Sequence, residues 1–476
     1  MCRPGACVDE VYRDVLVIGA GISGIGAAYY LKTRLPVATT FEVLDRSASL
    51  GGTWRLFTYP GVRTDSDMFS YSFSFHPWKS AVQFGTAAAI LEYLNEVVDT
   101  YDLRQFLRFG AHVVAADFST LDSCWRVRLK CGERYCCRHL VMAAGYYDVD
   151  EGHTPDIPGL DSFRGTLVHT QHWPEGLDCA GKHVVVIGSG ATAITIIPSL
   201  AKRAAHVTML QRSPTYIVGE RNTILPVPRP IQRALDVLGP RSMFASLYFG
   251  AMRYALVALS ALYYQFCRAL PGVAKKLTLY AAQKRLGADV NMVHFTPRYE
   301  LWDQRVCFAP DGDFFAAVRR SAKKQRGATG AKEQRGARAG ARGGASVVTA
   351  RIERISPTGI VLVPGSLAEP LPAEHTAEQT TELGADIIVL ATGLNLAFVG
   401  KVAVSIDGVP IVPSDHVTCV ARCCCEACFA SQRPFMLARS RLWAPVRRHP
   451  PSLTRLRTPV RLLFVCELAL SLSRSH

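Results

Sequence analysis

Two hydrophobic segments of this chain each run directly into a glycine-rich turn and then into a helix-forming segment. The first reads "DVLVIGAGISG", residues 14–24, and the second reads "KHVVVIGSGATA", residues 182–193. A buried strand, a tight glycine turn and a helix in immediate succession are the opening of a βαβ unit. Two such openings predict an α/β fold with two Rossmann-like dinucleotide-binding domains.

The first glycine turn carries the spacing of a dinucleotide fingerprint at Gly19, Gly21 and Gly24. The helix expected from about residue 22 to 33 would point its N-terminus at a pyrophosphate. Asp45 follows Gly24 by 21 residues and ends the next expected strand, "TTFEVLD", where a carboxylate binds a ribose hydroxyl. Glu42 competes for that role from inside the strand, and an ordinary tight turn is the structural alternative.

The second turn, with Gly188, Gly190 and Ala193, differs at the end of its next strand. "HVTMLQRS" carries Gln211 and Arg212 there and no acid. A carboxylate would repel a 2′-phosphate, whereas Arg212 can pair with it, unless it is an ordinary surface arginine. The first loop therefore suits FAD or NAD and the second NADP, and a chain that binds a flavin and NADPH passes hydride between them.

The rest of the chain divides around these two units. The predicted boundaries are a first domain over 10–155, a connector over 156–180, a second domain over 181–383, a return to the first domain over 384–416 and an atypical tail over 417–476. A mostly helical insertion is expected over 224–305. A disordered basic loop is expected over 321–344 and a polar loop over 365–382.

The basic charge of the chain is concentrated in two segments. Of a net charge of +15, residues 321–344 contribute +6 and residues 417–476 contribute +8. The remainder is close to neutral, which argues against nucleic-acid binding.

The segment "MFASLYFGAMRYALVALSALYYQF", residues 243–266, is about as long as a membrane span. Arg253 near its middle would be costly in hydrocarbon, so we expect a buried helix and no membrane contact. The first strand follows a short N-terminal stretch without an apolar leader, and we expect a cytoplasmic protein with reduced thiols.

The cysteines do not fit a disulfide reductase or a metal site. Cys136 and Cys137 are adjacent, and no CxxC pair follows "GGTW". The tail has five cysteines between residues 419 and 428, but no second pair completes a tetrahedral set, so no metal is expected.

Three further motifs resemble one known family. The connector matches FxGxxxHxxxWP through Phe163, Gly165, His169, Trp173 and Pro174. "GGTWRLFTYPGVRTD", residues 51–65, matches GGxWxxxxYPGxxxD, and an "ATG" turn lies at 391–393. Over residues 10–416 the chain resembles the type I Baeyer–Villiger monooxygenases, and looks most similar to the ethionamide-activating FAD-containing monooxygenases.

The resemblance implies FAD and NADPH as cofactors, with O₂ and a small ketone or sulfide as substrates. Oxygen activated at the flavin C4a carbon would be inserted into a ketone to give an ester or lactone. An N- or S-oxidising flavin-containing monooxygenase is the alternative, although its connector normally lacks the Trp-Pro ending. The sequence does not address the oligomeric state.

The resemblance also assigns roles to individual residues. Arg305 would be the fixed cation of the oxygenation site, and Asp65 would pair with it. Gly52, Trp54 and Asp65 would line the flavin, and Val113 would contact the adenine. His169 and Trp173 would belong to an interdomain switch. A salt bridge between Arg305 and Asp303, and a turn role for Asp65, are the alternatives.

The tail departs from the family. After "VSIDGVPIVPSDH" the family pattern returns to the first domain, and residues 417–476 do not show that return. A second hypothesis is therefore a C-terminally defective relative that binds nucleotides without oxygenating a substrate.

Overall fold

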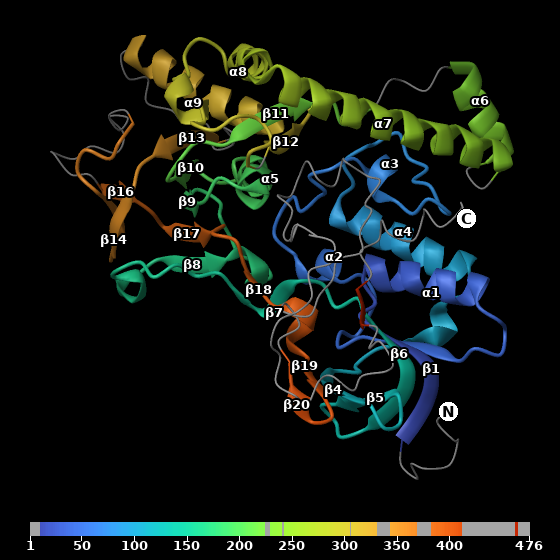
Figure 1. The fold of residues 1–476 in the computed structure, drawn as a ribbon. Helices are drawn as coiled ribbons and strands as arrows, with labels where there is room; N and C mark the ends of the chain where they lie inside the picture. The colour runs from blue at the N-terminus through green and yellow to red at the C-terminus, as the bar shows by residue number, and fades with distance from the viewer. Residues whose placement is uncertain are drawn as a thin grey trace.

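A computed structural model describes residues 10–223, 229–239, 242–304, 306–330, 343–368, 382–411 and 462–464. The described chain forms two α/β units, each built on a parallel-rich sheet (Figure 1). The expected α/β class with two dinucleotide-binding units is confirmed.

The first sheet is centred on β1 (Glu10–Ile18), which pairs in parallel with β2 (Phe41–Leu44) and with β6 (Arg134–Met142). Its strand order is β20-β19-β4-β5-β6-β1-β2-β3. The bounds of its further strands are β3 Leu107–Arg108, β4 Val113–Ser119, β5 Cys124–Leu129, β19 Ala403–Ile406 and β20 Val409–Pro410.

The two faces of β1 belong to different cores. Val15 and Val17 pack in the core that contains residues of α1 (Ile22–Arg34) and α4 (Ala87–Thr100), whereas Leu16 and Ile18 pack in the core of β4 and β5. Alternate residues of a strand point to opposite faces, and both faces are covered here. This explains why "VLVI" is hydrophobic without interruption.

The second sheet is entirely parallel, in the order β13-β10-β9-β17-β8. Its strands are β8 Thr166–His169, β9 His183–Ile187, β10 His206–Gln211, β13 Gly344–Thr349 and β17 Ile387–Leu390. Helices α5 (Ala191–Leu200) and α9 (Asp313–Gly330) accompany it, and β14 (Ile352–Ser356), β15 (Gly359–Leu362) and β16 (Glu382–Gly384) form a small antiparallel sheet.

The insertion between the second glycine loop and β13 is mostly helical, as the sequence indicates. It contains α6 (Arg229–Leu238), α7 (Met243–Ala269) and α8 (Pro271–Leu286), framed by the parallel pair β11 (Tyr216–Glu220) and β12 (Val306–Pro310). In Figure 1, α7 runs along the upper edge of the molecule between α8 and α6.

The expectation that α7 is buried is wrong. The most apolar 18-residue window of this helix is 11% buried, although α7 is long and apolar enough to cross a membrane. Its buried residues are Ala245, Phe249 and Cys267. Apolar composition predicts a helix, but it does not predict how much of that helix another element covers.

Two predicted boundaries also differ from the structure. Residues 321–330 continue α9 instead of forming a loop, because the good helix formers Ala, Lys, Gln and Arg extend a helix begun at Asp313. Residues 331–342 and 369–381 lie outside the described residues. Strand β17, placed after a return at residue 384, is central in the second sheet, and the chain rejoins the first sheet at β19.

One segment of the tail does return to the first sheet. Strand β21 (Leu462–Phe464) pairs in parallel with β6 at Leu140–Met142. The expectation that residues 417–476 lack such a return is therefore wrong for these three residues. The cysteine cluster of the tail lies outside the described residues.

Candidate active site

The first glycine turn brings backbone atoms closer together than any side chain would permit. A Cβ at Gly24 would lie 1.8 Å from the carbonyl oxygen of Gly19, and one at Gly19 would lie 2.4 Å from that of Ala143. Gly19 also has a φ of +109°, which side-chain-bearing residues rarely adopt. The turn thus packs helix α1 directly onto the ends of β1 and β6.

Next to this turn, the N-terminus of α1 is open to an anion. Gly21 is its N-cap and provides no side-chain cap, so the first-turn N–H groups are available. The Cα of Gly52 faces Gly21: a Cβ built on Gly52 would lie 3.0 Å from the Cα of Gly21. Two bare backbone segments beside a helix N-terminus fit the pyrophosphate of FAD.

Asp45, which is predicted to bind the ribose, accepts hydrogen bonds from the backbone of the same turn. Its Oδ2 accepts a hydrogen bond from the Ala20 N–H at 2.6 Å, and its Oδ1 accepts one from Ser47 at 2.7 Å. The residue is 8% exposed. A carboxylate has about four acceptor positions, so two backbone contacts leave capacity for a ribose hydroxyl. Its role toward the cofactor remains a prediction.

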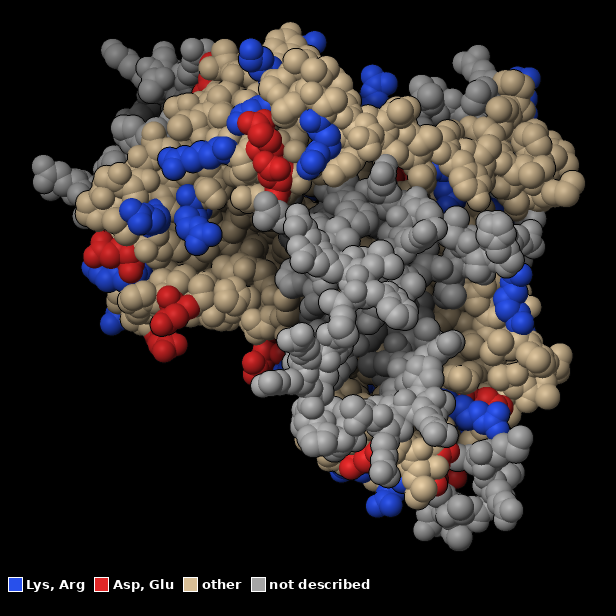
Figure 2. Space-filling view, in the orientation of Figure 1, with Lys and Arg blue, Asp and Glu red and all other residues tan. Residues whose placement is uncertain are grey.

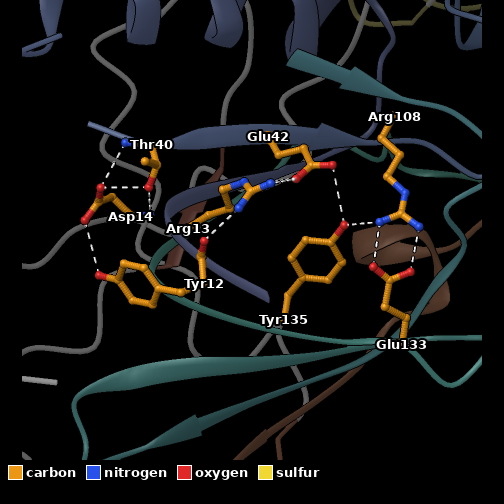
Figure 3. A network of polar contacts seen from close by, with 8 residues as sticks. All are labelled: Tyr12, Arg13, Asp14, Thr40, Glu42, Arg108, Glu133 and Tyr135. Atoms are coloured by element: carbon orange, nitrogen blue, oxygen red, sulfur yellow. Dashed lines mark hydrogen bonds and ion pairs between the residues drawn. The ribbon is translucent and has the colours of Figure 1, made fainter. Parts of the chain in front are cut away.

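Glu42, the other candidate for binding the ribose, is engaged by side chains of the first sheet. Figure 3 shows it between Arg13 and Tyr135, with an ion pair to Arg13 of 2.9 Å. The same network continues from Tyr135 to Arg108, whose guanidinium binds both carboxylate oxygens of Glu133 at 2.6 and 2.7 Å. Burial raises the pKa of Tyr135 to about 12. This cluster links strands of the first sheet, so Glu42 serves the sheet.

The second glycine turn repeats the close approach. Gly188 has a φ of +133°, and a Cβ there would lie 2.3 Å from the Ala391 carbonyl oxygen in the "ATG" turn. Gly190 is the uncapped N-cap of α5, and Ala193 is fully buried beneath it. Arg212 follows β10 and is exposed, where it can reach a 2′-phosphate. These residues fit NADP.

Residues 51–65, which carry the GGxWxxxxYPGxxxD motif and are called the motif segment below, pack against the second unit. Tyr59 is 8% exposed and belongs to the hydrophobic core of the second unit, with Phe57 and Val62 packed against that core. Arg63 forms a two-pronged ion pair with Asp313 at the start of α9, with N–O distances of 2.7 and 3.2 Å. The "YPGVR" stretch therefore connects the two nucleotide-binding units.

Sequence reasoning did not identify the pair between Arg63 and Asp313. Arg63 lies within a quoted motif, which is a signal that could have singled it out. Its partner stands 250 positions later, with no local pattern to mark it.

The remaining predicted flavin residues lie on different elements. Trp54, in the short helix α2 (Thr53–Leu56), is half-buried and donates from Nε1 to the Tyr71 hydroxyl at 3.2 Å. Val113 is buried at the start of β4. Asp65 is exposed. Arg305 lies outside the described residues, so its pairing with Asp65 and its cationic role remain predictions.

The connector forms the edge strand β8 of the second sheet. Phe163 packs against a core of that unit, and a Cβ on Gly165 would lie 2.5 Å from the Asp386 carbonyl oxygen. His169 ends β8, and Trp173 packs half-buried against the larger core of the second unit. The fingerprint residues are thus spread along one strand and the turn after it.

His169 contacts the chain that joins the two units. Its Nδ1 accepts a hydrogen bond from the Gln171 N–H at 3.1 Å, and a Cβ on Gly152 would lie 1.9 Å from its ring. Its Nε2 is buried without a hydrogen-bond partner among the described residues. Burial lowers the pKa of His169, which favours the neutral ring.

Two antiparallel strands, β7 (Tyr147–Gly152) and β18 (Leu394–Leu396), connect the two units, and we call them the crossing strands. Strand β7 follows the first sheet, and β18 follows the "ATG" turn and pairs with it. The buried Gln171 donates to the Asp148 carbonyl of β7 at 2.9 Å, and Thr170 donates to the Leu390 carbonyl at 3.3 Å. The connector therefore fastens to the crossing strands as well as to the second sheet.

The disulfide-reductase alternative finds no support in this geometry. Cys136 and Cys137 are successive residues of β6, so their side chains point to opposite faces of the sheet. Both are buried free thiols. Among the described residues, no group of three His, Cys, Asp or Glu side chains could hold a metal ion.

Comparison with known proteins places this geometry in a family. Residues 16–223 match the family model described as pyridine nucleotide-disulphide oxidoreductase. The FAD-containing monooxygenase EthA of Mycolicibacterium smegmatis is 39% identical over 411 residues, covering 85% of this chain and 74% of that protein. The probable FAD-binding monooxygenase AlmA of Acinetobacter baylyi is 38% identical over 407 residues, covering 84% and 72%.

Solved structures agree at the level of the fold. An oxidized steroid monooxygenase bound to NADP shares 25% identity with a TM-score of 0.59, covering 83% of this chain and 74% of that one. Caprolactone-bound cyclohexanone monooxygenase shares 24% identity with a TM-score of 0.60, covering 85% and 78%. With two glycine turns that fit FAD and NADP and relatives at 39% identity, the chain belongs to the FAD-containing monooxygenases, NADPH-dependent flavoprotein enzymes.

Proposed function

We propose that this monooxygenase inserts one oxygen atom of O₂ into a small ketone, giving an ester or lactone, and that it also oxygenates sulfides. FAD, held at the first glycine turn, would supply the redox chemistry that activates O₂, with NADPH at the second turn as the reductant. The residues of the chain bind the two nucleotides, orient them and hold the units together around the reacting groups.

The observation that carries this proposal is the contact between the connector and the crossing strands. His169 lies against Gly152 of β7, next to the "ATG" turn from which β18 leaves. Hydride transfer and oxygenation would require different placements of the two nucleotides, which a change in the angle between the units would supply. The connector pairs with the second sheet and donates a hydrogen bond to the crossing strands. It is therefore suited to set the angle between the two units.

Ketone oxygenation also needs a fixed positive charge for the developing oxyanion, and we assign it to Arg305. An arginine does not lose its proton at ordinary pH, and its attraction for an oxyanion is strong where water is excluded. Asp65 is the proposed partner. Arg63, two residues before Asp65, pairs with Asp313, so the segment that contains Asp65 contacts the second unit, to which Arg305 belongs in sequence.

Two other functions fit parts of the same site. Oxidation of soft sulfur or nitrogen requires the same nucleotides, but does not require a cation for a ketone oxyanion. A defective relative would bind nucleotides and release hydrogen peroxide. The return of β21 to the first sheet favours a working enzyme over this last alternative.

The test uses the purified full chain with FAD, NADPH and air, given a linear ketone, a cyclic ketone and an aryl methyl sulfide in turn. Gas chromatography should detect an ester or lactone from a ketone. The Asp65→Ala variant should lose ester formation by about 100-fold while retaining sulfoxidation more fully. Sulfoxide without any ester would move the assignment to the sulfur-oxidising class, and peroxide alone would favour the defective relative.

A further inference from the structure

Helices α7 and α8 present an apolar surface to solvent, which we call the α7–α8 face. Its large exposed side chains, with their exposed fractions, are Leu247 (66%), Tyr254 (69%), Leu259 (62%), Leu262 (68%), Leu277 (55%) and Tyr280 (68%). Soluble monomers rarely expose contiguous apolar patches of this kind, and larger ones mark protein or membrane contacts.

The spacing puts three of the four α7 members on one side of the helix. Leu247, Tyr254 and Leu262 follow one another at intervals of seven and eight residues, which is about two turns each. The opposite side packs inward through Ala245, Phe249 and Cys267. On α8, Val273, Leu277 and Tyr280 repeat the pattern at intervals of four and three. The α7 side chains span roughly 22 Å along the helix axis, and the exposed side chains of α8 add to this apolar surface.

A half-buried arginine, Arg253, prevents α7 from crossing a membrane. Arg253 reaches inward and donates to the backbone carbonyls of Phe69 and Ser72, beside helix α3 (Met68–Tyr71). Taking α7 into a bilayer core would break these bonds and move the charge into hydrocarbon. Only the outer side of the helix can meet lipid, so a position in the plane of the membrane surface is the one compatible with the fold.

The charges of the two helices select the kind of surface. Residues 243–286 contain six Lys or Arg residues and no Asp or Glu. Three of the six are engaged on the protein side: Arg253 as above, Lys275 with Glu300 at 3.4 Å, and Arg285 with the Gly219 carbonyl at 2.5 Å. The other three, Arg268, Lys276 and Lys284, are exposed. An apolar stripe bordered by cations and free of acids is complementary to anionic lipid.

The view of the whole molecule agrees with this distribution. In Figure 2 the surface along the upper edge, over the helices that Figure 1 labels α7 and α8, is mainly uncharged, with blue groups and a red group beside it near α8. A second copy of the chain is a less suitable occupant, because pairing two such faces would bring the exposed cations together with no acid from residues 243–286 to neutralise them.

We infer that the α7–α8 face docks this enzyme on the surface of an anionic membrane, with its leucine and tyrosine side chains inserted at the headgroup level. Tyrosine suits this position because its ring is apolar and its hydroxyl stays hydrated. The inference goes beyond the proposed oxygenation and does not depend on it. It proposes a membrane contact where the sequence analysis expects none.

The experiment is flotation of the FAD-loaded full chain with vesicles of phosphatidylglycerol and phosphatidylcholine, and separately of phosphatidylcholine alone. We expect binding to the anionic vesicles at least about tenfold stronger than to the neutral ones, and weaker at about 0.5 M salt than at 0.1 M. The Leu247→Glu/Leu262→Glu variant, and separately Lys276→Glu/Lys284→Glu, should each lose binding by about tenfold or more.

A matched control is Leu121→Glu, at a leucine that is 92% exposed in the β4–β5 turn, far from α7 in sequence. It should bind vesicles like the unaltered chain. Far-ultraviolet circular dichroism and flavin absorbance verify that each variant is folded. Two results would overturn the inference: no preference for anionic vesicles, or a concentration-dependent dimer that Leu247→Glu/Leu262→Glu dissociates while the unaltered chain ignores lipid.

Discussion

At the scale of single residues, Gly24 is the position where one methyl group does the most damage. A Cβ there would stand 1.8 Å from a backbone oxygen that cannot move aside without shifting the turn. We expect Gly24→Ala to cost about 3 kcal/mol or more and to abolish FAD retention, as measured by absorbance after gel filtration. The control is Gly250→Ala in α7, where a Cβ would meet open space and favour the helix.

Arg212 tests the assignment of the second nucleotide. We expect Arg212→Gln to lower kcat/KM for NADPH by about 10- to 100-fold, because it removes a charge-assisted contact to the 2′-phosphate. Activity with NADH, which lacks that phosphate, should change little. Steady-state kinetics with both cofactors measure the ratio. Equal losses with both would mean that Arg212 supports the fold and does not select the cofactor.

His169 should make stability depend on pH. Burial lowers its pKa, so as the pH falls the unfolded chain takes up this proton before the folded chain does. The contribution to stability is present above about pH 6.5, the ordinary value, and is lost as the pH falls toward the lower folded pKa. Urea unfolding between about pH 7 and 5 should show a steeper loss for the unaltered chain than for His169→Gln. Parallel curves would refute this.

At the scale of elements, the ion pair between Arg63 and Asp313 fastens the motif segment to α9. Its side chains are 16% and 31% exposed. We expect a double-mutant cycle of Arg63→Met and Asp313→Asn to give a coupling of about 1–2 kcal/mol. The exposed pair Arg104–Asp99, with side chains 54% and 61% exposed, is the control and should couple by about 0.5 kcal/mol or less. Equal couplings would contradict the docking role.

Elements were predictable from the sequence where local pattern decides them. The two strand–turn–helix openings and the helical insertion follow from glycine positions and unbroken apolar runs, and the structure contains them. The extension of α9 past residue 321 was not predicted, because glycine and repeat composition suggested a loop where helix formers prevail. Nor could apolar composition reveal that α7 keeps one side exposed, since coverage is decided by distant packing.

In the candidate site, too, the features set by local sequence were predictable and those set by distant contacts were not. Gly19, Gly188 and the connector motif are local signals, and each occupies the position that its pattern indicated. Asp45 was expected to face a ribose, and its contacts to two backbone N–H groups depend on a turn geometry that spacing does not contain. The partner of Arg63 could not be predicted from the sequence, because two residues 250 positions apart meet only through the fold.

At the scale of the whole molecule, we propose that the two nucleotide-binding units act as one oxygenase because the connector and the two crossing strands join them. The most direct measurement is the product formed per NADPH consumed, with a ketone substrate under ¹⁸O₂. We expect about one molecule of ester, carrying one ¹⁸O atom, for each NADPH consumed. NADPH consumption that yields labelled hydrogen peroxide and no ester would contradict it.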